Sequence, residues 1–228
     1  MRFIMVRHGE PNYEKDCLTP EGRRQAAAAA ERLAGEGISE IFSSPQGRAR
    51  ETASFTAEKL GLPITILDYM HEISWGGPDI PLNGHPWFLS NRMIAEENFD
   101  FSSMNWREHP YYRENAASEY FDMISGRIDA FFEERGYRHD GRRFLCLKPA
   151  EETIALFSHG GSGGCVLSHL LSLPFPYVAA VMPYDFTSVI ILDFPSSPGE
   201  YVFPRLALFN DVAHIRHVSK PRFQQDSE

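Results

Sequence analysis

The sequence has few cysteines and no long hydrophobic run, and each shortage excludes a class of protein. Its three cysteines, Cys17, Cys146 and Cys165, are odd in number, lie far apart and form no CxxC pair. This usage argues against a disulfide-stapled secreted scaffold and predicts a reduced, cytoplasmic chain. The apolar run after Arg2 is too short for the hydrophobic region of a signal peptide. No run reaches the roughly 18 apolar residues of a membrane span, so no membrane partner is expected.

Basic residues are also in the minority. The 228 residues include 22 Lys and Arg against 31 Asp and Glu, which gives a net charge of -9. Because duplex binding needs a basic stripe that neutralises phosphates, nucleic acid is not an expected partner. A small anionic substrate is compatible with this composition, since an acidic protein can contain a local cationic pocket. The length suits one domain over residues 1–228.

Short apolar segments alternate with helix-start signals along much of the chain. Strands are predicted at residues 2–6, 38–42, 64–67 and 153–157. Thr19 and Pro20 start one helix, and Ser44 and Pro45 start another that runs to about Leu60. A further helix is predicted over 165–171. This alternation predicts an α/β fold, a three-layer sandwich with a mostly parallel central sheet and helices on both faces.

The alternation breaks between about residues 74 and 150, where no clear strands occur. This stretch holds all three tryptophans, Trp75, Trp87 and Trp106, and two helical patches at 87–97 and 118–135. We interpret it as a helical cap inserted into the single domain. After it, strands at 187–194 and 201–209 are predicted to pair as an antiparallel hairpin, with Pro204 at an edge or bulge.

Side chains that can bind anions, attack phosphorus or transfer protons follow the predicted strands. Because strands of one parallel sheet end at the same edge, these groups are expected to converge. Arginine presents a planar fork that matches phosphate, and a helix N-terminus adds N–H donors, so the set predicts an anion pocket. A neutral histidine there can attack phosphorus, and a carboxylic acid can protonate a departing alkoxide. The residues are Arg7, His8, Arg48, Glu72, His159 and Gly160.

Several segments, in chain order, resemble the motifs of the histidine phosphatase superfamily, which includes cofactor-dependent phosphoglycerate mutases. The resemblance covers most of the chain outside 74–150. The segments are Arg7-His8-Gly9-Glu10, Leu18-Thr19-Pro20-Glu21-Gly22, Ser43-Ser44-Pro45-Gln46-Gly47-Arg48-Ala49, His71-Glu72-Ile73, Ser158-His159-Gly160-Gly161, and Asn210-Asp211 with His214.

The resemblance implies how the phosphoryl group is bound and transferred. His8 would be the nucleophile that becomes phosphohistidine. Arg7, Arg48 and His159 would bind the transferring phosphoryl group together with the backbone N–H of Gly160. Because the two arginines and His159 supply positive charge, this chemistry needs no metal and no other cofactor.

Glu72 would complete the reaction as general acid for the leaving group and then as base for water. The implied function is that of a phosphomonoester hydrolase acting on a small phosphorylated substrate. A mutase-type phosphotransferase is the alternative within the family. The stretch 74–150 shows no basic block like the one by which the mutases grip phosphoglycerate, and this favours the phosphatase.

The sequence also departs from the family pattern. Many relatives carry an Asn seven residues after the signature Arg, a position occupied here by Glu14. Asn12 lies closer to His8 and is predicted to supply a substrate contact instead. The segment after the acid reads Trp75-Gly76-Gly77-Pro78 and lacks the acidic Trp-Glu-Gly ending common among relatives. These departures bear on Glu72 more than on His8.

Two functions of other classes compete with this interpretation. Gly160-Gly161-Ser162-Gly163-Gly164 matches the G-x-S-x-G pattern of serine hydrolases, and Asp185 or Asp193 and then His214 follow in the right order. That reading leaves Arg7-His8-Gly9 and Arg48 unexplained. The other rival is a phosphate-binding module without turnover.

The remaining histidines enter none of these hypotheses. His214 and His217 lie three residues apart, but a metal pair would need further ligands, so a structural or surface role is favoured. No function is assigned to His71, His85, His109, His139 and His169.

Overall fold

The central sheet of the computed structural model, which describes residues 1–76 and 105–217, has six strands in the order β11-β9-β1-β8-β4-β5. Strands β1, β8, β4 and β5 are parallel, β9 is antiparallel to β1, and β11 is antiparallel to β9. The predicted α/β fold with a mostly parallel sheet is therefore confirmed. The strands are β1 (Arg2–Arg7), β4 (Glu40–Ser43), β5 (Ile64–Ile66), β8 (Thr153–Ser158), β9 (Val189–Asp193) and β11 (Arg205–Asp211).

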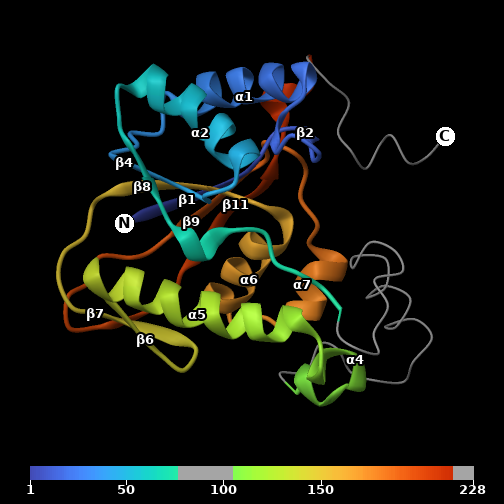
Figure 1. Cartoon of the computed structure of the whole chain (residues 1–228). Coiled ribbons are helices and arrows are strands. Elements are labelled where there is room, and N and C mark those ends of the chain that lie inside the picture. The colour runs from blue at the N-terminus through green and yellow to red at the C-terminus, as the bar shows by residue number, and fades with distance from the viewer. Residues whose placement is uncertain (77–104, 218–228) are drawn as a thin grey trace.

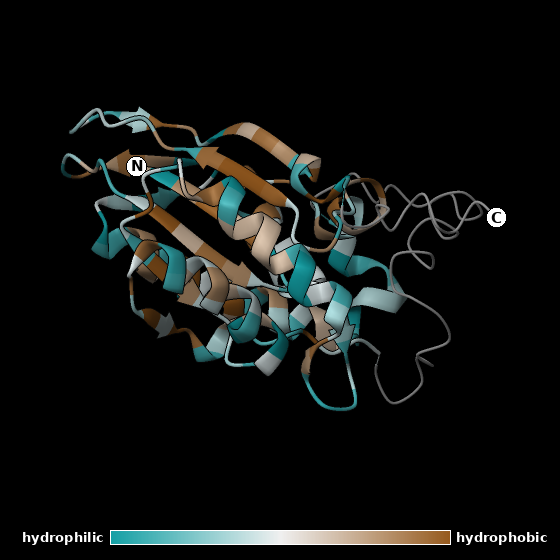
Figure 2. Cartoon of the chain, turned by 90° about the horizontal axis from the view of Figure 1, so that it is seen from above, coloured by the Kyte–Doolittle hydropathy of each residue, from teal (hydrophilic) through white to brown (hydrophobic). Residues whose placement is uncertain are grey.

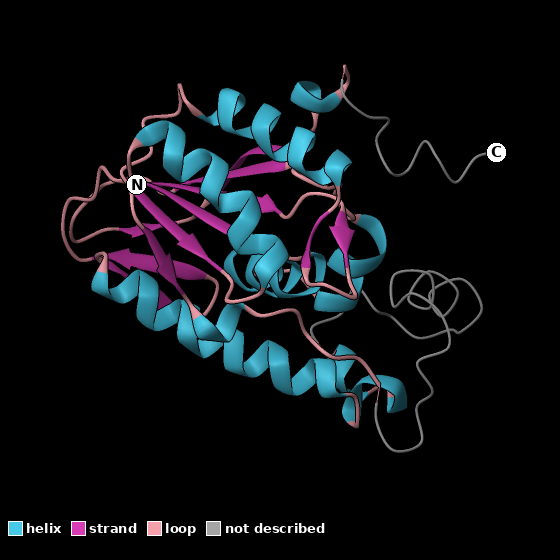
Figure 3. Ribbon diagram, turned by 45° about the horizontal axis from the view of Figure 1, so that its top comes forward, coloured by secondary structure: helices cyan, strands magenta, loops and turns pink. Residues whose placement is uncertain are grey.

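Helices cover both faces of this sheet (Figures 1 and 3). One layer holds α1 (Pro20–Leu33) and α2 (Gly47–Leu60), and the other holds α5 (Ala116–Glu134), α6 (Gly160–Leu171) and α7 (Phe175–Val181). Along β1, Ile4 and Val6 belong to the core under the first layer, whereas Phe3 and Met5 belong to the core under the second. Because both faces are buried, the central strands are hydrophobic between their end residues (Figure 2).

The two helices of the first layer begin differently. Thr19 caps α1 as predicted, accepting a hydrogen bond of 3.0 Å from Gly22 N, and Pro20 follows it. The second helix begins at Gly47, not at Ser44 and Pro45 as the sequence predicts. The Ser44 hydroxyl has other partners, and the carboxylate of Asp16 accepts from Gly47 N at 2.6 Å. A side chain from an earlier loop therefore supplies the cap.

Two strands lie in the stretch that the sequence predicts to be without them. They are β6 (Tyr137–Asp140) and β7 (Arg143–Cys146), joined through Gly141 in the left-handed region at φ 67°. A third strand, β10 (Tyr201–Val202), pairs antiparallel with β7. The predicted antiparallel pairing of the final strands is confirmed for β9 with β11, but Tyr201 and Val202 form β10, which joins the small sheet instead.

The helical part of that stretch lies partly within the described residues. The helix predicted over 118–135 is confirmed as α5, preceded by η2 (Trp106–Glu108) and α4 (Pro110–Arg113). α5 packs directly on the sheet, where the Phe132 ring lies 5.2 Å from that of Phe3 between centroids. The helix predicted over 87–97, with Trp87, lies outside the described residues. The helix predicted over 165–171 is α6, which begins earlier, at Gly160.

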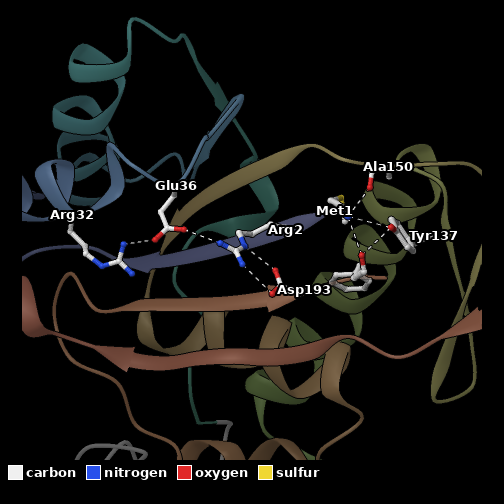
Figure 4. A network of polar contacts seen from close by, with 8 residues as sticks. Met1, Arg2, Arg32, Glu36, Tyr137, Ala150 and Asp193 are labelled. Carbon is white, nitrogen blue, oxygen red and sulfur yellow. Dashed lines mark hydrogen bonds and ion pairs between the residues drawn. The ribbon is translucent and has the colours of Figure 1, made fainter. Parts of the chain in front are cut away.

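Polar contacts hold the N-terminal end of β1 in place (Figure 4). The Met1 ammonium group donates to Ala150 O at 2.7 Å, and burial lowers its pKa. The Arg2 guanidinium bonds Asp193 of β9 at 2.9 Å and Glu36 beyond α1 at 3.1 Å. These contacts join β1 to neighbouring segments at the end of the strand away from Arg7. Within the described residues, no helix is both long and apolar enough to cross a membrane.

Candidate active site

Three neighbouring strands end side by side, and polar residues lie at or just after their carboxyl ends. β1 ends at Arg7, β4 at Ser43 and β8 at Ser158. Just beyond these ends, His8 N donates to Ser158 O at 3.0 Å, and Ser44 N donates to Phe157 O at 2.9 Å. The structure therefore brings together the segments that the sequence expects to converge, as the topology of a parallel sheet requires.

His8 and His159 form a buried pair at this edge. Their ring centroids are 5.1 Å apart, and the two side chains are 1% and 0% exposed. His8 Nδ1 lies 2.7 Å from Gly9 O. Because a carbonyl oxygen can only accept, Nδ1 carries the proton of the neutral ring, and the lone pair is left on Nε2. This is the tautomer that a nitrogen nucleophile requires.

The second histidine is held by Ser44. His159 occupies the N-cap position of α6 without a side-chain capping hydrogen bond, and its Nε2 lies 2.7 Å from Ser44 Oγ. Ser44 Oγ already accepts from Gln46 N at 3.2 Å, so its own proton is available to His159. Nδ1 of His159 is buried and has no partner in residues 1–76 and 105–217. Burial, the neighbouring His8 and the two arginines lower the pKa of His159 well below its usual value, so its ring is neutral. The expectation that His159 supplies positive charge is therefore wrong, and the charge comes from the arginines.

Arg7 is fixed by the loop that precedes β9. Its Nη1 donates to Tyr184 O at 2.5 Å, and its guanidinium carbon lies 4.6 Å from the centroid of the Phe186 ring. The Tyr184 hydroxyl in turn donates to His159 O at 2.7 Å. Burial raises the pKa of that hydroxyl, which therefore stays protonated and able to donate. Tyr184 thus joins β1 to the start of α6.

Arg48 lies in the first turn of α2, where the sequence argument places it, and is 6% exposed. Its Nη1 donates to Asp16 Oδ1 at 2.5 Å, and its Nη2 donates to Gln46 Oε1 at 3.1 Å. Its Nε is buried and has no partner within the part of the chain that the structure describes. The guanidinium is therefore oriented by two neighbours while one donor stays available.

Glu72 lies against the N-terminus of α6. Its carboxylate accepts from Ser162 N at 2.9 Å and from Gly161 N at 3.2 Å, where the helix dipole favours negative charge. A Cβ on Gly161 would lie 2.6 Å from Glu72 Oε1, so glycine permits this approach. Gln46 Oε1 accepts from Glu72 N at 2.7 Å as well as from Arg48, and so it links the carboxylate segment to the arginine.

The two remaining substrate-binding candidates are Gly160 and Asn12. Gly160 begins α6 beside His159, and its carbonyl accepts from the Tyr184 hydroxyl at 3.1 Å. Asn12 belongs to β2 (Pro11–Asn12), which pairs with β3 (Cys17–Leu18), and its Oδ1 accepts from Lys15 N at 3.1 Å. That contact shapes the turn of the hairpin, and a substrate contact from Asn12 stays a prediction.

Sequence reasoning missed three residues that hold the site together, namely Asp16, Gln46 and Tyr184. Each acts across the fold, since Asp16 and Arg48 are 32 residues apart and Tyr184 and Arg7 are 177 apart. Gln46 stands inside a recognised motif, but no local pattern shows that its amide oxygen bridges two segments. Only the positive φ of Asp16, 46°, marks its loop as specialised, and that angle is a property of the structure.

The serine hydrolase triad is not assembled. Ser162 is fully buried, and its hydroxyl donates to Met70 O at 3.2 Å. His214, in η3 (Ala213–Ile215), has its Nε2 3.3 Å from Thr187 Oγ1, and Thr187 N donates to Arg7 O at 3.0 Å. His214 therefore supports the loop beside Arg7. Ser162 matches the serine hydrolase pattern only in the glycines that flank it in the sequence.

The fold and the site together define an α/β protein with a buried cluster of two histidines and two arginines at the carboxyl ends of its parallel strands. The family model of the histidine phosphatase superfamily (branch 1) matches residues 3–204, and the chain belongs to this superfamily. The superfamily is enzymatic. A curated relative of this chain carries a mutase name, and solved structures with a similar fold carry phosphatase names.

Known proteins of both kinds are similar over nearly the whole chain. The probable phosphoglycerate mutase GpmB of Yersinia enterocolitica is 29% identical over 231 aligned residues, which cover 94% of this chain and 95% of the relative. The structure of mycobacterial glucosyl-3-phosphoglycerate phosphatase Rv2419c has a TM-score of 0.62 at 23% identity and covers 92% of this chain and 98% of its own. Phosphoserine phosphatase from Entamoeba histolytica, solved with 3-phosphoglyceric acid, has a TM-score of 0.62 at 20% identity, with coverage of 94% and 98%. These structures confirm the fold.

Proposed function

We propose that the protein is a metal-independent phosphomonoester hydrolase that works through a phosphohistidine on His8. One observation carries this proposal. Two buried nitrogen atoms of the candidate site, Nδ1 of His159 and Nε of Arg48, have no partner among the described residues. An unsatisfied buried donor costs roughly 1–3 kcal/mol. A bound phosphate would satisfy both donors, because its oxygens only need to accept.

The tautomers support this assignment. If the Ser44 hydroxyl donates to Nε2 of His159, the proton of the neutral ring is on Nδ1, which becomes a donor to a phosphoryl oxygen. Arg7 and Arg48 add charge that needs little rearrangement during the reaction, since Tyr184 and Gln46 already orient them. The N–H of Gly160, at the start of α6, adds a further donor.

The proposed reaction has two steps. In the first, the Nε2 lone pair of His8 attacks phosphorus, the bond from phosphorus to the ester oxygen breaks, and Glu72 gives its proton to the departing alkoxide. In the second, Glu72 takes a proton from water while the water oxygen attacks phosphorus and the phosphorus–nitrogen bond breaks. Phosphate leaves, and His8 returns to its neutral form.

A mutase is the second candidate, favoured by the name of the Yersinia relative that matches 94% of this chain. Both activities would use the same phosphohistidine and differ in whether water or a second hydroxyl takes the phosphoryl group. The phosphatases among the similar structures and the lack of a basic block in 74–150 favour the hydrolase. We propose a small phosphomonoester as substrate.

Phosphate release separates these possibilities. Wild type is incubated with p-nitrophenyl phosphate and a panel of phosphomonoesters, beside His8→Ala and the exposed control His217→Ala. A hydrolase releases phosphate from wild type and the control but not from His8→Ala. A mutase moves phosphate between positions of a phosphoglycerate with little release. No turnover by wild type on any substrate would identify a binding module.

A further inference from the structure

A second cluster of polar side chains lies outside the proposed active site. It consists of Asp129 on α5, His139 on β6 and His169 in the last turn of α6, three elements that pack together (Figure 1). Nδ1 of His139 and Nε2 of His169 lie 2.9 and 2.6 Å from the same oxygen, Asp129 Oδ1. Neither the sequence motifs nor the proposed reaction uses any of these residues.

We propose that Asp129, His139 and His169 form a binding site for a divalent transition metal ion of the zinc type. The ligands are Nδ1 of His139, Nε2 of His169 and a carboxylate oxygen of Asp129, with water in the fourth position. Imidazole nitrogen and carboxylate oxygen are ligands that zinc takes in proteins, and three protein ligands with a water are a known zinc arrangement.

The geometry is close to what such an ion requires. The ligand atoms all lie within 4.8 Å of one another. In a tetrahedral zinc site with bonds of about 2.0–2.2 Å, neighbouring ligand atoms are roughly 3.3–3.6 Å apart. The two contacts to Asp129 must therefore lengthen by less than about 1 Å. The two histidine nitrogens, at most 4.8 Å apart, must come within the same range.

The surroundings suit a metal ion as well. The side chains of His139 and His169 are 13% and 14% exposed, whereas that of Asp129 is 37% exposed, so solvent reaches the carboxylate. The ring of His139 stacks on Phe144 at 4.5 Å between centroids, which restrains its orientation. Oδ1 of Asp129 thus faces the ligating nitrogens of both rings and is reached by solvent.

The site would cross-link the second helix layer to the small sheet. The three ligands come from α5, β6 and α6, and Asp129 is separated from His139 by 10 residues and from His169 by 40. Ten residues of helix α6 separate His169 from His159, a distance of about 15 Å at 1.5 Å per residue. A metal ion here would stabilise the fold without contacting the proposed active site.

Zinc titration tests this site independently of the proposed function. The full chain, stripped with a chelator, is titrated with Zn²⁺ by calorimetry in a buffer without phosphate, beside Asp129→Asn and His169→Gln. His217→Asn controls for histidine number, and His8→Ala controls for metal in the active site. We expect one ion per chain in wild type and both controls. Because outer-shell changes alone weaken metal sites about 10–100-fold, loss of a ligand should weaken binding at least about tenfold.

Two further measurements keep the result decisive. Circular dichroism checks that each variant is folded, and Zn²⁺ should raise the unfolding midpoint of wild type but not of Asp129→Asn. Anomalous scattering at the zinc edge should place the ion between the three side chains in wild-type crystals. Equal affinity in wild type and both folded variants, no stoichiometric binding by wild type, or an ion located elsewhere would overturn the proposal.

Discussion

The Ser44 hydroxyl oxygen lies 2.7 Å from Nε2 of His159, and both residues are fully buried. This contact joins the end of β4 to the start of α6. If Ser44 accepts from Gln46 N and donates to Nε2, the proton of the neutral His159 ring is on Nδ1. The pair therefore connects an ordinary-looking serine to the chemistry of the proposed phosphate pocket.

Removing the Ser44 hydroxyl should impair turnover more than substrate binding. In Ser44→Ala, Nε2 of His159 loses its hydrogen-bond partner, and a buried ring nitrogen is left unsatisfied at a cost of about 1–3 kcal/mol. We expect kcat for p-nitrophenyl phosphate to fall by about tenfold or more, with a smaller change in KM. Ser54→Ala, at an exposed serine of α2, is the matched control and should leave kcat unchanged. Unaltered kcat in a folded Ser44→Ala would show that the contact has no catalytic role.

Glu72→Gln should affect esters according to their leaving group. Glutamine keeps an oxygen that can accept from the N-terminus of α6 but cannot donate a carboxylic proton. We expect alkyl phosphates, whose alkoxides need that proton, to slow by about 10²–10⁴-fold. p-Nitrophenyl phosphate should slow much less. Glu58→Gln, at an exposed carboxylate of α2, is the control. Equal slowing of both classes of ester would assign the acid to another residue.

A glycine pair tests how closely Glu72 approaches α6. Gly161→Ala would place a Cβ 2.6 Å from Glu72 Oε1, so overpacking should destabilise the fold by about 1–3 kcal/mol and displace the carboxylate. Gly126, within α5, has open space at its Cβ position. Gly126→Ala should stabilise the protein by about 0.5–1 kcal/mol, because alanine is the better helix former. Urea unfolding measures the free energy of unfolding of each variant. Similar changes in Gly161→Ala and Gly126→Ala would contradict the close approach of Glu72 to α6.

The buried His159 should make stability fall in mild acid. Its pKa is well below 6.5 in the folded protein, so the unfolded chain binds its proton first as the pH falls. The contribution of neutral His159 is therefore complete above pH 6.5 and is lost below it. Each pH unit then costs about 1 kcal/mol until the folded pKa is reached. Urea unfolding at a series of pH values should show this slope in wild type and a shallower one in His159→Gln. Equal slopes would mean that another group titrates.

Much of the fold follows from local sequence patterns. The strands β1 and β8 are continuous apolar runs because both of their faces are buried, and α5 is long and amphipathic. The hairpin of β6 and β7 escaped prediction because Tyr137–Asp140 has mostly polar side chains and no apolar run. The late start of α2 also escaped prediction, since its cap comes from Asp16, 31 residues before Gly47.

The same distinction holds for the site. Arg7 ends β1, and His8 and His159 follow directly after strands. Arg48 lies in the first turn of α2, so strand order brings all four to one side of the sheet. Tyr184 and the cluster of Asp129, His139 and His169 have no local pattern, because their contacts exist only once distant elements have packed.

The central claim is that His8 becomes covalently phosphorylated, and trapping the intermediate tests it most directly. Wild type is mixed with p-nitrophenyl phosphate, quenched in base within one turnover, and examined by mass spectrometry. We predict one phosphoryl group per chain, labile to acid and mapped to His8, and none in His8→Ala. A phosphoryl group on another residue, or steady hydrolysis by folded His8→Ala at the wild-type rate, would contradict the mechanism.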